Sequence, residues 1–283
     1  MKIAIIGSGF FGATLGLFLS KKHDVHIFEK KNKVLNGASA TNQFRFHLGY
    51  HYPRSQKTVT EINKSKNSFT SFYGKKILKK TKNYYLIANR SKVSYSKYIK
   101  FLRKNRLYNK KVKNIVSSKE IQASIITNEK ILNYFNFKKI ILNRIKNSKL
   151  KIKFNQEFNK SFLKKYDKII IATYSNNNFI LNKLGVKKLN DYKFELVEKI
   201  LIKLPKKYSN NSYVVIDGKF VCVDPYLGTK YHLLSDVKNS KLETKIGKYP
   251  NFKHKNKKYI NKGIIKNPKI SEFKKFIKRS SIY

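Results

Sequence analysis

The first thirty residues carry the pattern that most restricts how this chain can fold. An apolar run over residues 2–6 leads into a Gly-Ser-Gly-Phe-Phe-Gly stretch over residues 7–12, and a second apolar run over residues 25–28 ends at Glu29. This order predicts a strand, a glycine turn, a helix over residues 11–22 and a second strand. A βαβ unit of this kind binds a dinucleotide, because the free N–H groups and the positive dipole end of its helix face the pyrophosphate.

Each glycine has a physical role in such a unit. Gly7 permits the tight turn, Gly9 lets the backbone approach the pyrophosphate, and Gly12 lets the helix pack against the strand. Gly16 extends the spacing to G-x-G-x-x-G-x-x-x-G, which is commoner in FAD-binding than in NAD-binding folds. Glu29 is placed to accept hydrogen bonds from ribose hydroxyls. The alternative, a glycine-rich turn that binds nothing, is disfavoured because the motif stands in its full context.

The formal net charge of +49 raises the question of a nucleic-acid partner. Only seven of the 64 basic residues are arginines, the residues that usually grip bases and phosphates, and the lysines run along the whole chain. Lysine, asparagine and isoleucine are used together, as AT-rich coding would produce. We therefore expect no specific nucleic-acid partner, and only nonspecific attraction to polyanions at low salt.

Several other site types are excluded by composition. Cys222 is the single cysteine, so no internal disulfide forms, and the histidines lack the helical spacing of a zinc site, so we expect no metal. No apolar stretch is long enough to form a transmembrane helix. Residues 2–19 lack the small-x-small cleavage site of a signal peptide. We expect a cytoplasmic protein.

The rest of the chain divides into two styles of structure. Helices are predicted over 55–73, 94–105, 130–147 and 271–279, and strands over 83–88, 151–154 and 166–173. The strand over 166–173, which ends in Ala172-Thr173, suits a buried parallel strand beneath a cofactor. From residue 190 the pattern is antiparallel. Strands are predicted over 194–204, 213–216, 219–223 and 231–234, with an Asp217-Gly218 type I′ turn.

The predicted fold is α/β, with the nucleotide-binding domain split by an insertion. Residues 1–80 and 148–187 are expected to form a Rossmann-like FAD-binding domain with a parallel sheet. Residues 81–147 and 188–283 are expected to form an antiparallel α+β substrate or cap domain. This layout is unusual for an NAD dehydrogenase and ordinary for a flavoprotein.

The segment over residues 40–52 resembles a known family. Its pattern Asn-x-x-x-x-His-x-Gly-x-x-Tyr, carried by Asn42, His47, Gly49 and Tyr52, is similar to FAD-dependent oxidoreductases of the D-amino-acid-oxidase-like superfamily. The nearest branch is L-2-hydroxyglutarate-dehydrogenase-like. The resemblance is strong over residues 1–55 and weak over residues 150–240.

The resemblance implies FAD as cofactor. It implies that the loop over 38–42 follows the pyrophosphate and ribityl chain, and that the stretch from His47 approaches the isoalloxazine ring. The cofactor-binding residues implied are Gly7, Gly9, Phe10, Phe11, Gly12, Glu29, Lys30, Ser39, Ala40, Thr41, Asn42, His47, Ala172 and Thr173. Two departures stand out: Phe44 replaces a glycine of the branch, and no C-terminal glycine segment closing the flavin pocket occurs before Tyr283. The resemblance therefore points to a member that lacks this segment.

Five residues are candidates for catalysis or substrate binding. His47 and His51 lie in the segment nearest the flavin and can act as bases near neutral pH. Arg45 and Arg54 offer planar forks for a substrate carboxylate. Tyr226 lies on the hairpin sheet that can cover the flavin. Each also has a plain structural interpretation, as a hydrogen-bonded histidine, a surface arginine or a turn aromatic.

These observations predict an enzyme that oxidises a small amino acid, hydroxy acid or related metabolite by hydride transfer to flavin. The electron acceptor, which can be oxygen, a quinone or a carrier, is left open. One alternative is a non-redox flavoenzyme such as a nucleotide-sugar mutase. Another is a truncated or degenerate FAD-fold protein that binds polyanions.

Overall fold

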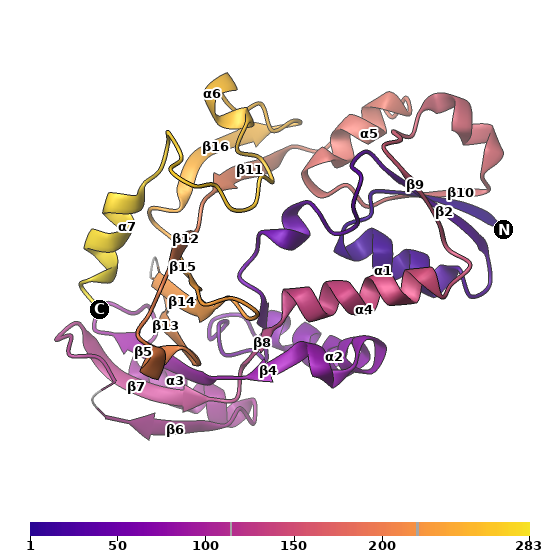
Figure 1. The fold of residues 1–283 in the computed structure, drawn as a ribbon. Coiled ribbons are helices and arrows are strands. Elements are labelled where there is room, and N and C mark those ends of the chain that lie inside the picture. The colour runs from indigo at the N-terminus through magenta and orange to yellow at the C-terminus, as the bar shows by residue number, and fades with distance from the viewer. Residues whose placement is uncertain (114, 219–220) are drawn as a thin grey trace. The chain divides into compact units, whose positions relative to one another are not determined.

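The computed structural model describes residues 1–113, 115–218 and 221–283, which form two compact units (Figure 1). Each unit is assembled from three separate stretches of chain. Unit 1 comprises Met1–Asn42, Lys138–Leu196 and Glu243–Ile270, and unit 2 comprises Gln43–Phe137, Val197–Leu242 and Ser271–Tyr283. Among these described residues, no helix is long and apolar enough to cross a membrane.

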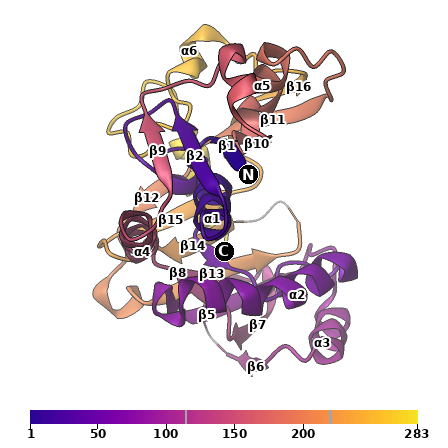
Figure 2. The same cartoon turned by 90° about the vertical axis from the view of Figure 1, so that its right-hand side faces the viewer.

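Unit 1 is built on a four-stranded parallel sheet in the order β10-β1-β2-β9. Its strands are β1 (Lys2–Ile6), β2 (Asp24–Glu29), β9 (Lys151–Phe154) and β10 (Lys168–Ile171). Figure 2 shows β9 and β2 side by side, with helix α1 (Phe10–Leu19) close to them. Residues 3–6 and 25–28 are continuously buried, as expected of strands covered on both faces. The predicted strand–helix–strand unit is confirmed.

Glycines allow α1 to lie directly on this sheet. A Cβ built on Gly12 would stand 1.8 Å from the carbonyl oxygen of Gly7, and one on Gly16 would stand 2.8 Å from Cδ1 of Ile27. Gly7 itself has φ +98°, a conformation that side chains rarely adopt. The glycine spacing therefore sets how closely helix and strand approach.

The remaining elements of unit 1 surround this sheet. They include α5 (Asn177–Lys183), α6 (His254–Lys257), the short 3-10 turns η1 (Ala38–Ala40), η3 (Lys160–Lys165) and η4 (Tyr174–Asn176), and the paired strands β11 (Tyr192–Val197) and β16 (Lys241–Gly247). An aromatic cluster packs around Phe28, whose ring centroid lies 5.0 Å from that of Phe158. Helix α4 (Tyr134–Lys146) starts in unit 2 and runs into unit 1.

Unit 2 contains a seven-stranded sheet in the order β12-β15-β14-β13-β5-β7-β6. Its strands are β5 (Lys82–Ala88), β6 (Asn109–Val112), β7 (Ile121–Thr127), β12 (Ile200–Ile202), β13 (Asn211–Ile216), β14 (Val221–Pro225) and β15 (His232–Asp236). The pairing of β5 with β13 is parallel, and the other neighbouring pairs are antiparallel.

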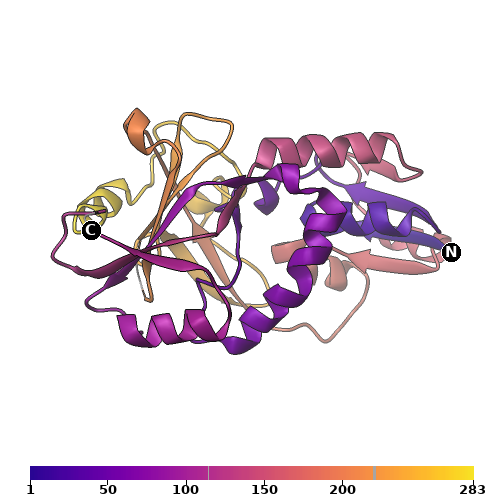
Figure 3. The ribbon, with the colours of Figure 1, turned by 90° about the horizontal axis from the view of Figure 1, so that it is seen from below.

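Two helices cover opposite faces of this sheet. Tyr98 and Leu102 of α3 (Tyr95–Lys104) pack with Tyr85 and Ile87, whereas Phe276 of α7 (Phe273–Ser280) packs with Leu86 and its neighbours. Because side chains alternate along a strand, residues 85 and 87 face one helix and residue 86 faces the other. Figure 3 shows both helices at the sheet.

A smaller sheet completes unit 2. It has the order β3-β8-β4, with β3 (Arg45–Phe46), β4 (Leu78–Lys80) and β8 (Lys130–Leu132). Helix α2 (Gln56–Tyr73) and the turn η2 (Lys75–Ile77) connect β3 to β4, and η5 (Lys206–Tyr208) precedes β13.

The structure corrects three local predictions. The helix expected over 130–147 begins at Tyr134, because residues 130–132 form β8 and the N–H of Leu132 donates to the carbonyl of Phe44 (2.7 Å). The strand expected over 194–204 is two strands, β11 and β12, interrupted where the Glu198 carboxylate accepts from the N–H of Glu272 (2.5 Å).

The hairpin of β13 and β14 is present, but Tyr213 pairs with Val223, whereas a two-residue Asp217-Gly218 turn would pair it with Cys222. The pairing register of the two strands therefore differs by one residue from the predicted one. Lys219 and Phe220 lie outside the described residues.

The predicted α/β class with a parallel and an antiparallel sheet is confirmed, but the units divide at other positions than expected. Residues 43–80 belong to unit 2, because β3 and β4 pair with β8. Residues 138–147 belong to unit 1, where α4 leads into β9, and residues 243–270 belong there because β16 pairs with β11.

Candidate functional site

The N-terminus of α1 in unit 1 leaves room for a ligand. Its N-cap residue, Gly9, has no side chain to cap the helix, and the first turn holds no acidic residue. A Cβ built on Gly9 would meet one atom within 4 Å, the Oγ of Ser39 at 3.5 Å. That hydroxyl accepts a hydrogen bond from the N–H of Phe10 (2.9 Å). Backbone donors at a helix N-terminus, beside a glycine that lets a ligand come close, fit a pyrophosphate.

Glu29 is held beside this turn by three hydrogen bonds. Its Oε2 accepts from the N–H (2.9 Å) and the hydroxyl (2.7 Å) of Ser8, and its Oε1 accepts from the N–H of Lys31 (2.9 Å). The carboxylate is thereby fixed at the end of β2, and Oε1 keeps a lone pair for a ribose hydroxyl. Sequence reasoning selected Glu29 but missed Ser8, whose role depends on its contact with that acid.

The other residues of unit 1 that are expected at the cofactor lie around the same turn, and His47 belongs to unit 2. The carbonyl of Ala172, directly after β10, stands 2.7 Å from a Cβ built on Gly7, and Thr173 donates to Oδ1 of Asn177 (2.9 Å). In the loop after β2, Ala40 belongs to η1, Thr41 donates to the carbonyl of Ala38 (3.4 Å), and Asn42 donates to that of Ser39 (3.0 Å). Lys30 and Phe11 are exposed.

Unit 2 contains a buried polar cluster centred on Arg45. The guanidinium donates to the Oδ1 of Asp224, to Ser212 Oγ (2.8 Å), to Asn83 Oδ1 (3.2 Å), to Tyr85 Oη (3.2 Å) and, through Nε, to Glu129 Oε1 (3.4 Å). We refer to these six residues as the Arg45 cluster. The Arg45 side chain is 2% exposed, and those of Glu129 and Asp224 are 0% exposed.

Electrostatics favour the ionised forms of Arg45 and Glu129. Burial by itself lowers the pKa of Arg45, but Asp224, Tyr85 and Glu129 raise it well above its ordinary value. Burial alone would raise the pKa of Glu129, but Arg45 and the hydrogen bond from His47 lower it to about 2. A buried charge persists when it is paired and hydrogen-bonded in this way.

His47 connects the Arg45 cluster to solvent. Its Nδ1 donates to Oε1 of Glu129 (2.8 Å), and its side chain is 31% exposed. A histidine whose Nδ1 is bound to a carboxylate carries its free lone pair on Nε2, so Nε2 is the atom that can accept a proton. Neighbouring His51, with its ring centroid 5.2 Å away, has its pKa lowered to about 4 by burial and then by the charges of His47 and Arg45.

A second chain of polar contacts leads from Asp224 to a lysine. Gln43 donates to Oδ2 of Asp224 (2.8 Å) and accepts from the ammonium of Lys199 (2.9 Å), while Cys222 donates to the same Oδ2 (2.9 Å). Burial lowers the pKa of Lys199 and raises that of Cys222 well above its ordinary value. Sequence reasoning missed Gln43, Glu129, Lys199 and Asp224 as site residues, because their burial depends on partners far along the chain.

The structure brings Arg45, His47 and His51 together and places the other two catalytic candidates elsewhere. Arg54 is exposed and pairs with Asp217. Tyr226 is buried and stacks on Phe44, with ring centroids 5.5 Å apart. Among the described residues, no group of histidine, cysteine, aspartate or glutamate side chains is arranged to hold a metal ion.

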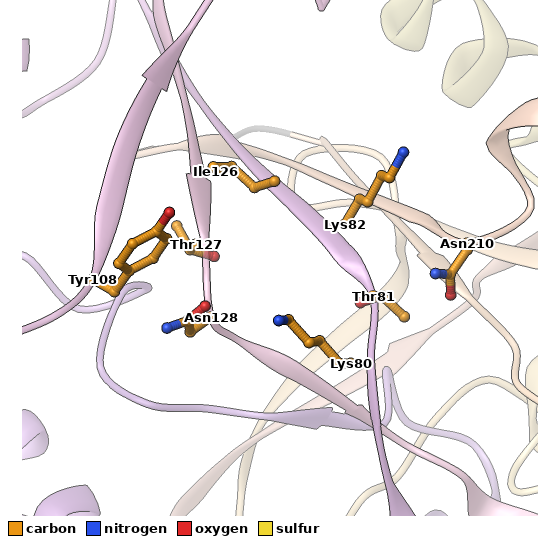
Figure 4. A pocket seen from close by; sticks show the side chains of 8 residues that line it. All are labelled: Lys80, Thr81, Lys82, Tyr108, Ile126, Thr127, Asn128 and Asn210. Carbon is orange, nitrogen blue, oxygen red and sulfur yellow. The ribbon is translucent and has the colours of Figure 1, made fainter.

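A pocket of about 310 Å³ lies in unit 2, outside the Arg45 cluster (Figure 4). Its lining residues are Lys80, Thr81, Lys82, Tyr108, Ile126, Thr127, Asn128 and Asn210. The hydroxyl of Thr81 accepts from Asn83 (2.5 Å) and so adjoins the cluster. The lining offers hydrogen-bond donors and lysines but contains no histidine or carboxylate.

Comparisons with known proteins support the nucleotide-binding part of this picture. The sequence profile of the NAD(P)-binding Rossmann-like domain matches residues 5–69. A curated relative, the FAD-dependent monooxygenase FPY4 of Fusarium mangiferae, is 35% identical over 71 residues, which are 25% of this chain and 18% of the relative. The match therefore spans less than a fifth of the length of that relative.

Solved structures extend the similarity to most of the chain. Glycine oxidase from Geobacillus kaustophilus matches with a TM-score of 0.64 and 13% identity, covering 91% of this chain and 75% of the oxidase. L-proline dehydrogenase from P. horikoshii matches with a TM-score of 0.65 and 15% identity, covering 92% of this chain and 74% of the dehydrogenase. L-alpha-glycerophosphate oxidase from Mycoplasma pneumoniae, with FAD bound, matches with a TM-score of 0.62 and 15% identity, covering 87% of this chain and 72% of that oxidase. At these identities the comparison shows a shared fold.

Proposed function

We propose that this chain is an FAD-dependent oxidoreductase that oxidises a carbon bearing an amine or a hydroxyl group in a small molecule. The observation that carries the proposal is the open helix N-terminus at Gly9, with the Glu29 carboxylate fixed beside it. This geometry suits a dinucleotide. The shared fold of glycine oxidase, proline dehydrogenase and FAD-bound glycerophosphate oxidase supports FAD as that dinucleotide.

Different residues of unit 1 would contact different parts of the cofactor. The N–H groups at the start of α1 and Ser39 would face the pyrophosphate, and Glu29 would accept from the adenosine ribose. Ala172 and Thr173 close the turn from the β10 side. When bound, FAD supplies the two-electron acceptor for the substrate C–H bond.

His47 is the residue we assign to proton transfer. Oxidation of an amine or alcohol by hydride loss also releases the N–H or O–H proton, and Nε2 of His47 would accept that proton. Glu129 holds the opposite ring nitrogen and stabilises the resulting positive charge. Arg45 fixes Glu129 in turn, since its own donors are engaged inside the cluster.

The finer assignment rests on fewer residues. The pattern of Asn42, His47, Gly49 and Tyr52 supports the L-2-hydroxyglutarate-dehydrogenase-like branch and a small amino or hydroxy acid as substrate. Arg54, which is exposed and paired with Asp217, is the arginine we propose for the substrate carboxylate. The electron acceptor and a cytoplasmic location stay predictions.

The test compares two glycines. The purified protein is titrated with FAD, and bound flavin is measured by its absorbance bands and quenched fluorescence. Gly9→Ala is expected to keep the fold, because φ of −66° suits alanine and the new Cβ meets only Ser39, yet to weaken FAD binding at least about tenfold by blocking the pyrophosphate. Gly37→Ala, where a Cβ meets nothing within 4 Å, is the control. A folded wild-type protein that takes up no flavin contradicts the proposal.

A further inference from the structure

Helix α1 is apolar on all of its sides. It contains no charged residue from Phe10 to Leu19. Gly12, Ala13, Gly16 and Leu17 are buried on the side that faces the sheet. A helix that is apolar all round is normally covered all round. The outer side of α1 therefore requires its own explanation.

Three large apolar side chains stand exposed on that outer side. Phe11 is 70% exposed, Leu15 is 36% exposed and Phe18 is 60% exposed. At 100° per residue, positions 11, 15 and 18 fall within one narrow stripe, opposite the buried residues. Single exposed apolar residues are common on protein surfaces, but a continuous stripe marks an interaction surface.

Lysines flank this stripe. Lys21 and Lys22 follow α1 directly and are exposed. The part of α4 that belongs to unit 1 leads from β2 to β9 through a parallel crossover, as α1 leads from β1 to β2, so both helices lie on the same face of the sheet (Figure 1). That part of α4 exposes Lys139, Leu142 and Lys146.

We propose that this face binds peripherally to an anionic phospholipid bilayer. We call it the α1–α4 face and define it by Phe11, Leu15, Phe18, Leu142, Lys21, Lys22, Lys139 and Lys146. Aromatic and aliphatic side chains enter the boundary between headgroups and acyl chains, while the lysines contact lipid phosphates. The inference does not depend on whether unit 1 binds FAD.

The net charge of the chain favours an anionic bilayer over a second copy of the chain as the partner of the α1–α4 face. Two chains that each carry a net charge of +49 repel one another, whereas an anionic surface attracts each of them. A polyanion such as nucleic acid satisfies the lysines but leaves the phenylalanines in water. A bilayer with anionic headgroups satisfies both parts of the face.

The chain lacks tryptophan, so one introduced tryptophan reports on its own site. Phe18→Trp is mixed with vesicles of phosphatidylcholine alone and with vesicles containing an equal amount of phosphatidylglycerol. We expect its emission to shift to the blue, and to be quenched by brominated lipid, only with the anionic vesicles. Ile246→Trp is the control, because Ile246 is 77% exposed on β16 of the same unit and lies outside the face.

Co-sedimentation measures the strength of binding. The double variant Leu15→Gln with Phe18→Gln is expected to partition about tenfold or more less strongly to anionic vesicles than the wild type, because it removes most of the inserted apolar surface. Ile246→Gln is expected to bind anionic vesicles as strongly as the wild type does. High salt is expected to weaken the binding of the wild type and of Ile246→Gln alike. Circular dichroism verifies that all variants fold.

Two results would overturn the proposal. Equal binding of the double variant, with no blue shift of the Phe18→Trp protein, would mean that the lysines attract anions nonspecifically. A blue shift that appears without vesicles and grows with protein concentration would mean that a second copy covers the stripe.

Discussion

Nδ1 of His47 lies 2.8 Å from Oε1 of Glu129, whose side chain has no solvent exposure. The two groups lie at different depths, because Glu129 is buried among the other residues of the Arg45 cluster while His47 is 31% exposed. The buried carboxylate fixes the ring and its tautomer, and the exposed edge of the ring is left for chemistry. Glu129 is therefore held in place by its partners, whereas the partly exposed His47 can react.

Glu129→Gln tests whether Glu129 positions His47 and His47 carries the reaction. The variant keeps the shape but removes the charge that offsets Arg45, so we expect the free energy of unfolding to fall by about 3 kcal/mol. If His47 accepts the substrate proton, turnover falls further than flavin binding does. Urea denaturation, flavin titration and turnover measure the three effects. Glu157→Gln, which removes the acid of the exposed Lys183–Glu157 pair, is expected to change stability by less than about 1 kcal/mol.

Two arginines that look alike in the sequence are expected to respond differently to the same change. Arg45→Met leaves Glu129 and Asp224 buried without their counter-charge, and we expect a loss of about 3–5 kcal/mol in unfolding free energy. Arg54→Met breaks a pair between an exposed arginine and the half-buried Asp217, and its urea midpoint is expected to fall much less than that of Arg45→Met. Equal destabilisation by both changes would contradict the assigned environments.

His51 is expected to make the protein less stable below neutral pH. Its pKa is about 4 in the folded protein against an ordinary 6.5, so the unfolded chain binds more protons between these values. Its contribution to stability is therefore complete above pH 6.5 and is lost as pH falls towards 4, by roughly 3 kcal/mol.

The measurement is urea denaturation of the wild type and of His51→Gln at a series of pH values. The variant is expected to show a flatter profile across this window, although His26 and His232, whose pKa values are also lowered, keep part of the slope. His254→Gln changes an exposed histidine and serves as control. Parallel profiles for wild type and His51→Gln would disprove this linkage.

Gly12→Ala is expected to damage unit 1 itself. The added Cβ would overlap the carbonyl oxygen of Gly7, which belongs to the rigid backbone, so helix and strand must separate. We expect weaker flavin binding together with a lower unfolding midpoint, in contrast to Gly9→Ala, which loses binding alone. Thermal unfolding with and without FAD distinguishes the two glycines.

Local patterns predicted the parts of the fold that depend on neighbouring residues. The strand, glycine turn and helix of β1 and α1, and the helix over 55–73, follow from apolar spacing and turn residues in a short window. Residues 130–132 were misassigned to a helix because their apolar spacing continues into α4. They form β8 because β3 and β4, more than 40 residues earlier, supply their partners.

The sequence likewise predicted only part of the candidate site. Arg45, His47 and His51 stand close together in a distinctive segment, and the structure brings them into one place. Glu129 follows Thr127 and Asn128, and this polar run has the composition of an exposed turn. Its burial arises from Arg45, 84 residues away, which no local pattern contains.

The division of both units among separate stretches of chain determines when each can be completed. On the ribosome, β1 and β2 are made first, but their outer neighbours β9 and β10 follow only after residue 150. In unit 2, β5 must wait for β13, more than 120 residues later. Apolar strand edges therefore stay unpaired during much of synthesis, and folding of this chain is expected to be slow and exposed to aggregation until its last third has been translated.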